Sequence, residues 1–251
     1  MYQIPELLKF PKLFHTFSTK ADGNMANSIL GRVVNFDEVI SNREKFLSKV
    51  GVNQNKCICM WVVHKDEIIE PDPKKIGISM KDYKKAMKVD GLITNKKNLY
   101  LFVLIADCLP IILYDLKVPA LTLVHAGWRG VDLKIAKKAV IKMHEKYGSN
   151  ITDIIAGIGP SVHKESFLKE NPSQKSDPKW QSYLTKIGET KYQVDLIGFV
   201  KKQLEDSGVL PKNIFVSDVD TGSDERFYSH NRDKNLPVSQ QGRFCCVVGM
   251  L

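Results

Sequence analysis

Several features that mark whole classes of protein are scarce or missing in this 251-residue chain. The longest wholly apolar run is Leu99–Ala106, far short of the roughly 20 residues that a membrane-spanning helix needs. The segment Met1–Phe14 lacks the basic start and long apolar stretch of a signal peptide. The five cysteines are odd in number and have no spacing typical of small secreted proteins. We therefore expect a cytoplasmic protein with no membrane partner, in which a special cysteine serves as a ligand or a nucleophile.

Arginine is also scarce, although the chain is strongly basic. The formal net charge is +9, yet only six of the 37 basic residues are arginines. Scattered lysines are typical of a solvated surface, whereas arginine is preferred where a phosphate or carboxylate is held through two hydrogen bonds. Four of the six arginines lie between residues 129 and 243. We therefore expect no nucleic-acid partner, and we look to these arginines for recognition of a small anion.

The patterning of apolar residues predicts an α+β fold. Hydrophobic residues make up 43% of the chain and charged residues 26%, which excludes a disordered chain and a disulfide-stapled scaffold. Apolar residues at helical spacing predict helices over Asp37–Val50, Val131–Tyr147, Ser176–Ile187 and Asp195–Asp206. Short β-branched or aromatic runs predict strands over Ile58–Val63, Gly91–Thr94, Leu99–Ile105, Ile111–Tyr114, Leu121–Val124, Asp153–Ile158, Asn213–Ser217 and Phe244–Val248. Because several strands follow one another too closely for intervening helices, we expect mixed sheets in one domain over residues 1–251, not a regular doubly wound fold.

Three of the predicted strands each end at or near a side chain that can bind a metal ion. One strand runs into His64, the next into Asp107 and Cys108, and the third into His125. Loops at strand ends are where sheet proteins hold reactive groups on a rigid support. Two histidines and a cysteine form a ligand set of the kind found in catalytic zinc sites. The spacing alone leaves open the alternative that Cys108 is a buried apolar residue and both histidines are merely hydrogen-bonded.

The other cysteines are expected to lie in the core. In a strand, Cys57 and Cys59 face the opposite side from His64, so they do not complete a ligand set with it. The neighbours Cys245 and Cys246 point to opposite faces of their strand and cannot clamp one ion together.

Glycine-rich and polar loops add further candidates for chemistry. In the segment 125–130 (HAGWRG), two glycines allow close backbone approach, and Arg129 lies just before a predicted helix whose N-terminal amides favour an anion. The segment 157–161 (GIGPS) is a second turn that could cradle phosphate, and Gly242-Arg243 could direct a guanidinium inward. The segment 220–233 (DTGSDERFYSHNRD) is so polar that a plain solvated loop is an equal alternative.

These segments together resemble the bacterial polyphenol oxidase or laccase-domain family. The resemblance rests on the motifs ADCLPI (106–111), HAGWRG (125–130), GIGPS (157–161), DTGSDERFYSHNRD (220–233) and GRF (242–244). HTFSTKADGNM (15–25) and VDGLITN (89–95) are similar to the opening segment and the Asp-Gly strand of the family. The chain has Val62 and Lys65 where the family usually has glutamine and glycine, and Lys20 where it usually has arginine. The implied fold is a layered α/β/β/α sandwich.

The resemblance implies a zinc-dependent purine nucleoside phosphorylase that acts on adenosine, inosine, guanosine and methylthioadenosine, with adenosine deaminase as a second activity. Its partners are then purine nucleosides and phosphate. The family's metal ligands carry over to His64, Cys108 and His125, which are also the catalytic candidates together with Asp107. The candidate substrate contacts are Arg129, Arg243, Lys20 and Arg226. Zinc held in this way acts as a Lewis acid or activates water.

Three alternatives remain open from the sequence. A copper-dependent polyphenol oxidase is one, since copper binds such ligands more tightly than zinc. The chain has only six histidines and none in a close pair, so a multicopper cluster is not supported. A hydrolase with Cys108 as nucleophile and His125 as base, acting on peptidoglycan precursors, is the second. A nucleic-acid-binding module driven by the basic charge is the third.

Overall fold

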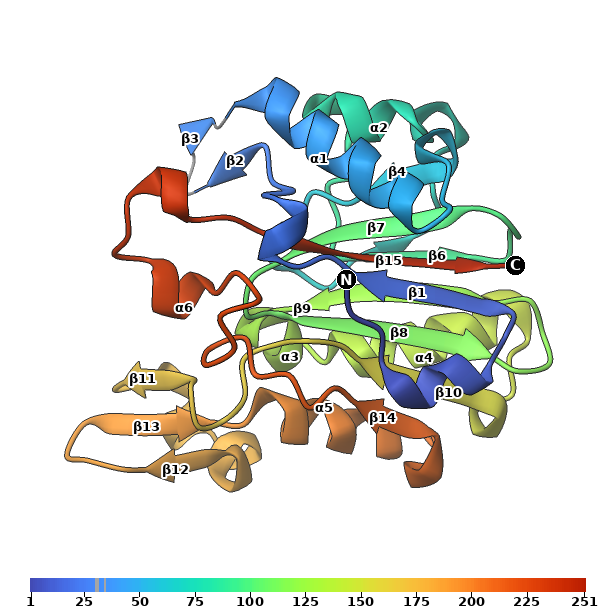
Figure 1. Ribbon diagram of the computed structural model, residues 1–251. Coiled ribbons are helices and arrows are strands. Elements are labelled where there is room, and N and C mark those ends of the chain that lie inside the picture. The colour runs from blue at the N-terminus through green and yellow to red at the C-terminus, as the bar shows by residue number, and fades with distance from the viewer. Residues whose placement is uncertain (30–31, 34) are drawn as a thin grey trace.

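The computed structural model describes residues 1–29, 32–33 and 35–251 and shows an α+β domain in four layers (Figure 1). One central layer is a four-stranded sheet with the order β1 (Leu13–Phe17), β15 (Phe244–Met250), β7 (Tyr100–Ile105) and β4 (Cys57–Cys59). The other is a six-stranded sheet with the order β14 (Ile214–Val216), β10 (Ile154–Ile158), β8 (Leu109–Asp115), β9 (Leu121–Ala126), β6 (Gly91–Thr94) and β5 (Ile68–Ile69). Both sheets mix parallel and antiparallel pairs, as predicted.

Helices form the two outer layers (Figure 1). The four-stranded sheet is covered by α1 (Phe36–Lys49) and α2 (Ile78–Lys81). The six-stranded sheet is covered by α3 (Trp128–Asp132), α4 (Ile135–Tyr147) and α5 (Leu196–Glu205). The four layers confirm the α/β/β/α sandwich.

Smaller elements complete the domain. A three-stranded sheet of β11 (Leu168–Glu170), β13 (Lys191–Val194) and β12 (Leu184–Lys186) projects from one end beside α6 (His230–Asp233), and β2 (Ser28–Ile29) pairs with β3 (Arg32–Val33). Short 3-10 helices occupy connections at Pro5–Lys9, Lys20–Asp22, Gln54–Lys56, Pro73–Lys75, Tyr83–Lys85, Ile151–Asp153, Ser173–Ser176, Pro178–Tyr183, Pro211–Asn213 and Val238–Gln240.

Each pair of adjacent layers encloses its own apolar core. The core between the sheets includes Leu101 and Leu123, one from each sheet. The core under α1 includes Phe46 and Phe102, and the core under α4 and α5 includes Ile111. Because both faces of each sheet are buried, the central strands are apolar at nearly every position, which is why they appear as continuous hydrophobic runs in the sequence.

Three predicted elements differ from the structure. The helix predicted over Ser176–Ile187 is wrong, because the chain forms a 3-10 helix from Pro178 and then β12, which pairs with β13. The predicted helix Val131–Tyr147 is divided in two at Lys134, whose φ of 59° is left-handed. The predicted strand Ile58–Val63 keeps regular pairing only through β4, with a single further bridge at Met60.

The predictions for the other cysteines are confirmed. Cys57 and Cys59 are buried in the core beneath α1 and α2. Cys245 lies in the same core, whereas its neighbour Cys246 faces the core between the two sheets. Burial raises the pKa of all four thiols, which keeps them protonated and inert.

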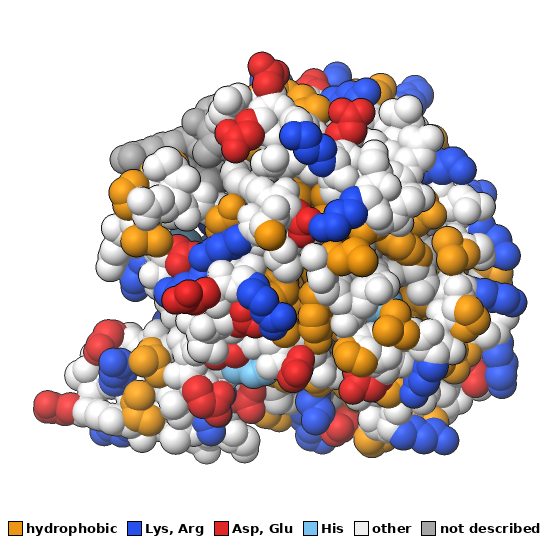
Figure 2. Space-filling view, in the orientation of Figure 1, with side chains coloured by type: hydrophobic (Ala, Val, Ile, Leu, Met, Phe, Trp, Pro, Cys, Tyr) orange, Lys and Arg blue, Asp and Glu red, His pale blue; other side chains and the backbone are white. Residues whose placement is uncertain are grey.

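The surface accounts for most of the basic charge. Lys and Arg side chains are dispersed over the visible face with acidic side chains between them (Figure 2). Within the described residues, no helix combines the length and the apolar composition needed to cross a membrane.

Candidate metal centre

The structure brings the three predicted ligands together from two connections and one strand. His64 follows β4, Cys108 lies in the turn between β7 and β8, and His125 is part of β9. Their ligand atoms all lie within 4.8 Å of one another. The two imidazole rings are 5.0 Å apart and nearly perpendicular, at 88°. Two nitrogens and one sulfur converging in this way form a set that can hold one metal ion.

Gly127 leaves the room that this set needs. A Cβ at Gly127 would lie 3.1 Å from the Sγ of Cys108 and 3.3 Å from the Cδ2 of His64. These distances are tighter than ordinary contact, so any larger residue would push the ligands apart. The first glycine of the HAGWRG motif is therefore explained by the close packing of the three ligand side chains, and the residues present fit a metal ion.

Asp90, which the sequence analysis did not select, holds the ligands in place. Its carboxylate is completely buried at the start of β6 and accepts hydrogen bonds from the backbone N–H groups of Val63 (3.2 Å), His64 (2.9 Å) and Lys65 (2.8 Å). It also lies 2.9 Å from Nδ1 of His125. The bond to Nδ1 directs the other ring nitrogen of His125 toward the metal site, as carboxylates do in zinc proteins. The available sequence signal was a lone aspartate directly before an apolar strand, in VDGLITN.

The three ligands carry strongly coupled charges. Burial by itself raises the pKa of the Cys108 thiol, but the adjacent His125 and His64 outweigh burial and lower it below the ordinary value. Burial likewise lowers the pKa of His125, but the Cys108 sulfur and the Asp90 carboxylate reverse this and raise it. The pair therefore favours a thiolate beside an imidazolium. A thiolate is the form of cysteine that binds metals and attacks carbonyl carbons.

Asp107 lies next to Cys108 in a strained backbone conformation. Its φ is 78°, and His64 also has a positive φ of 58°. The Asp107 carboxylate accepts hydrogen bonds from the Thr221 hydroxyl (2.8 Å) and from the backbone N–H of Asn231 (2.6 Å). Positive φ at non-glycine residues is uncommon and is often found at functional sites. The polar segment 220–233 thus supports the site and is not a plain solvated loop.

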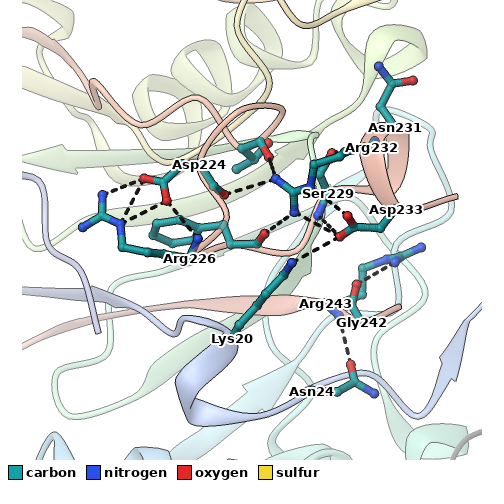
Figure 3. Close-up of polar contacts among 12 residues, drawn as sticks. Lys20, Asn24, Asp224, Arg226, Ser229, Asn231, Arg232, Asp233, Gly242 and Arg243 are labelled. Atoms are coloured by element: carbon teal, nitrogen blue, oxygen red, sulfur yellow. Dashed lines mark hydrogen bonds and ion pairs between the residues drawn. The ribbon is translucent and has the colours of Figure 1, made fainter. Parts of the chain in front are cut away.

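Arg232 organises this segment (Figure 3). Its guanidinium donates to the carbonyl oxygens of Thr221 and Phe227 and to the carboxylate of Asp233. Two predicted substrate contacts are tied to the same network. Lys20 lies 3.7 Å from the Asp233 carboxylate, and Arg226 pairs with Asp224 through three hydrogen bonds between their side chains.

Two cavities meet at His64. The first, named here the Arg243 cavity, has a volume of about 360 Å³ and is lined by Ala26, Asn27, Arg43, Cys59, Met60, Trp61, Val62, His64, Ser79, Tyr83, Ala86, Leu104 and Arg243. The second, named here the Arg129 cavity, has a volume of about 310 Å³ and is lined by His64, Ala106, Asp107, Cys108, Gly127, Trp128, Arg129, Val162, Phe167, Lys169, Leu196, His230 and Asn231. Arg243 and Arg129 thus line cavities beside the metal ligands, whereas Lys20 and Arg226 line neither.

The glycines of the GIGPS segment are explained by packing in the core. A Cβ at Gly157 would lie 2.5 Å from Leu7, and one at Gly159 would lie 2.4 Å from the ring of Phe17. The segment lines neither cavity in the described part of the chain, so the structure provides no phosphate cradle there.

Comparison with known proteins agrees with this geometry. The model of a family described as multi-copper polyphenol oxidoreductase laccase matches residues 18–251. The chain belongs to this laccase-domain family. It is 30% identical over 219 residues to purine nucleoside phosphorylase YlmD of Bacillus subtilis, covering 85% of this chain and 77% of that protein. It is 28% identical over 217 residues to purine nucleoside phosphorylase RP494 of Rickettsia prowazekii, covering 81% and 82%.

A solved structure of the same laccase-domain fold superimposes closely. The crystal structure of the hypothetical protein YfiH of Bacillus licheniformis aligns with a TM-score of 0.86 at 26% sequence identity. The alignment covers 97% of this chain and 94% of that chain. Despite the family's description, the described residues contain a single His/Cys cluster able to bind metal, which suits one ion and not a multicopper relay.

Proposed function

We propose that this chain is a zinc-dependent purine nucleoside phosphorylase, with adenosine, inosine, guanosine and methylthioadenosine as substrates and adenosine deaminase as a second activity. The observation that carries the proposal is that two cavities meet at His64, one of the three clustered candidate metal ligands. Phosphorolysis brings a nucleoside and a phosphate to one glycosidic bond, so it needs adjoining space for both. The names of the YlmD and RP494 relatives support the same activity.

The metal-binding residues of the proposal are His64, Cys108 and His125. Zinc suits a donor set of two imidazoles and a thiolate and would supply a Lewis acid beside the substrate. Asp90 keeps Nδ1 of His125 hydrogen-bonded and the His64 loop closed, so the ligands are arranged before metal arrives.

The remaining residues bind and orient the reactants. In phosphorolysis a phosphate oxygen forms a bond to C1′ of the ribose, the bond from C1′ to the purine nitrogen breaks, and the base leaves with a proton. Of the four predicted substrate contacts, Arg129 and Arg243 are placed to bind a reactant, and either can hold phosphate, because Lys20 and Arg226 are engaged with Asp233 and Asp224. Asp107, fixed by two hydrogen bonds, faces the Arg129 cavity and would orient a hydroxyl or amino group of the nucleoside.

A thiol hydrolase is the second candidate, and one observation favours it. Cys108, His125 and Asp90 form a chain of nucleophile, base and orienting carboxylate, with the thiolate form of Cys108 favoured. Such an enzyme would act without metal, on an amide of a peptidoglycan precursor or a related acyl group. His64, the third member of the trio, is neither nucleophile, base nor orienting group in that mechanism, whereas metal binding uses all three side chains, which is why we rank metal chemistry first.

Metal analysis paired with a phosphate-dependent nucleoside assay tests the proposal. We expect zinc bound at one ion per chain, and inosine converted to hypoxanthine and ribose 1-phosphate only when phosphate is present. A chelator should abolish turnover, and added zinc should restore it. Cys108→Ser should lose both zinc and turnover, whereas Cys57→Ser, which removes a thiol remote from the site, should keep the zinc.

Other outcomes would favour the alternatives. Full phosphorolysis and full zinc content in Cys108→Ala would contradict the proposed mechanism. Hydrolysis that survives chelation but stops on alkylation of Cys108 would indicate the thiol hydrolase. Copper in place of zinc, together with oxidation of phenols, would indicate the polyphenol oxidase.

A further inference from the structure

Arg43, on α1, is a buried cation without a buried anion. Its side chain is only 1% exposed, and it lines the Arg243 cavity. Its guanidinium donates to the carbonyl oxygens of Met25 (2.9 and 2.7 Å) and Met80 (2.9 Å) and to Oδ1 of Asn27 (2.7 Å). All of these acceptors are neutral, and no carboxylate of the described residues forms an ion pair with it. Residues 28–34, which lie nearby in the sequence, include no acid.

The hydrogen bond from Arg43 determines how the amide of Asn27 is oriented. Asn27 is 6% exposed and lines the same cavity. Because its Oδ1 faces the guanidinium, its NH₂ group is directed elsewhere, and none of the described residues accepts a hydrogen bond from it. This NH₂ group is not among the fully buried polar atoms that lack a partner, and because Asn27 lines the cavity, a ligand there can accept a hydrogen bond from it.

Arg243 supplies a second cation to this cavity. One of its N–H groups donates to the carbonyl oxygen of Gly242 (2.7 Å), and the rest of the guanidinium is free of protein acceptors among the described residues (Figure 3). The Cys108 sulfur and the Asp107 and Asp233 carboxylates act on it electrostatically, but none of them forms an ion pair with it. Asp233 pairs with Arg232, whereas Asp107 accepts hydrogen bonds only from neutral groups of the described residues.

The two cavities therefore differ in charge. The Arg243 cavity is lined by two guanidinium groups and no carboxylate, whereas the Arg129 cavity combines the cations Arg129 and Lys169 with the Asp107 carboxylate. A buried cation is normally paired or shifted toward neutrality, and arginine does not lose its proton in proteins. The Arg243 cavity thus presents two cationic side chains with which no carboxylate of the described residues forms an ion pair.

We propose that the Arg243 cavity is the binding site for the inorganic phosphate, held by hydrogen bonds from Arg243 and the Asn27 amide and by the field of Arg43. The assignment rests on the proposed phosphorolysis and makes it more specific, because it separates the roles of the two cavities. The nucleoside then occupies the Arg129 cavity, between the aromatic side chains Trp128 and Phe167 and the polar groups around Asp107. His64, which lines both cavities, is where the two substrates meet.

The substitution Asn27→Asp tests this assignment without removing Arg43. The new carboxylate keeps an oxygen facing the guanidinium, so it balances the buried charge, and the fold should be as stable as the wild type or more stable. At the same time it replaces the donor that phosphate needs by an anion. We expect the Kd for phosphate, measured by calorimetry on the zinc-loaded protein without nucleoside, to rise by about tenfold or more, since like charges repel strongly in a buried site.

Two further variants and two further ligands complete the experiment. Arg243→Met should weaken phosphate binding in the same way, and Asn55→Asp, which makes the same change of charge at an exposed position, should leave it unchanged. In the turnover assay, Asn27→Asp should raise the KM for phosphate while the KM for inosine and the zinc content stay near wild type. Phosphate should bind without nucleoside, and the free base hypoxanthine, which does not react with phosphate, should not displace it; adenosine 5′-monophosphate should bind no more tightly than phosphate.

The assignment would be overturned if the wild type bound no phosphate, or if Asn27→Asp and Arg243→Met both bound it normally. It would also be overturned if only the nucleotide bound, because the anion site would then serve a phosphorylated substrate. A different result is expected if the phosphate site is correct but the proposed phosphorylase function is wrong. In that case phosphate binds the wild type and is lost in Asn27→Asp, but no nucleoside is split.

Discussion

Replacement of Asp90 by asparagine keeps the shape of the side chain, but it should weaken metal binding and lower the free energy of unfolding. In the wild type, two carboxylate oxygens serve four donors. Oδ1 accepts from the backbone N–H of His64 and lies 2.9 Å from Nδ1 of His125, and Oδ2 accepts from the N–H groups of Val63 and Lys65. Asparagine has one oxygen, so in either orientation its NH₂ group faces two of the four donors.

Each orientation has a definite consequence. If the NH₂ faces Val63 and Lys65, two buried donors lose their acceptor and the loop carrying His64 opens. If it faces His125, the imidazole must accept at Nδ1, which places its proton on the nitrogen that the metal needs. A buried donor without a partner costs about 1–3 kcal/mol, so we expect the free energy of unfolding to fall by about 2–6 kcal/mol. Loss of such an orienting partner typically weakens metal binding by about 10–100-fold.

Competition with a chromophoric chelator measures the zinc affinity of Asp90→Asn, and denaturant unfolding of the metal-free protein measures its stability. Asp72→Asn is the matched control, because Asp72 accepts a single backbone hydrogen bond at the surface. We expect the control to match the wild type in both measurements. Wild-type zinc affinity and stability in Asp90→Asn would refute the view that this carboxylate arranges the ligands.

Three further changes probe other parts of the structure. Gly127→Ala should weaken zinc binding by about tenfold, because the added methyl group crowds two ligands; unchanged affinity in the chelator assay would show that the ligands can shift freely. His15→Gln should remove a pH dependence: burial lowers the pKa of His15 to about 4, so the unfolded chain binds the proton first, and wild-type stability should fall by about 3 kcal/mol between pH 6.5 and 4. If the free energies of unfolding of the wild type and the variant differed by a constant amount from pH 6.5 to 4, His15 would not be the source of the pH dependence. Arg232→Met should lower the free energy of unfolding by about 2–4 kcal/mol and reduce turnover through Asp107, with zinc content retained; loss of zinc would instead tie segment 220–233 to the metal itself.

Much of the fold follows from local patterns in the sequence. The central strands are apolar at successive positions because both of their faces are buried, so the sequence predicts them with nearly correct bounds, as Leu99–Ile105 against β7 shows. The helix predicted over Ser176–Ile187 is wrong because the spacing of its apolar residues reflects contacts with distant segments. Trp180 is fully buried and donates to Asp132, and Tyr183 stacks on Phe199, so tertiary contacts and not helical periodicity set their spacing.

The sequence by itself determined the α+β class, the family and the three candidate metal ligands, since strand ends and short motifs are visible along the chain. Only the tertiary structure decided which charged side chains pair with one another. It placed Asp90 beneath His125, tied Lys20 and Arg226 to neighbouring acids, and left Arg43 and Arg243 facing a cavity without a carboxylate. Sequence distance does not predict these pairings, because each joins segments that the sheets bring together from far apart. The basic composition proved less informative than the position of two guanidinium groups that form no ion pair with a carboxylate of the described residues.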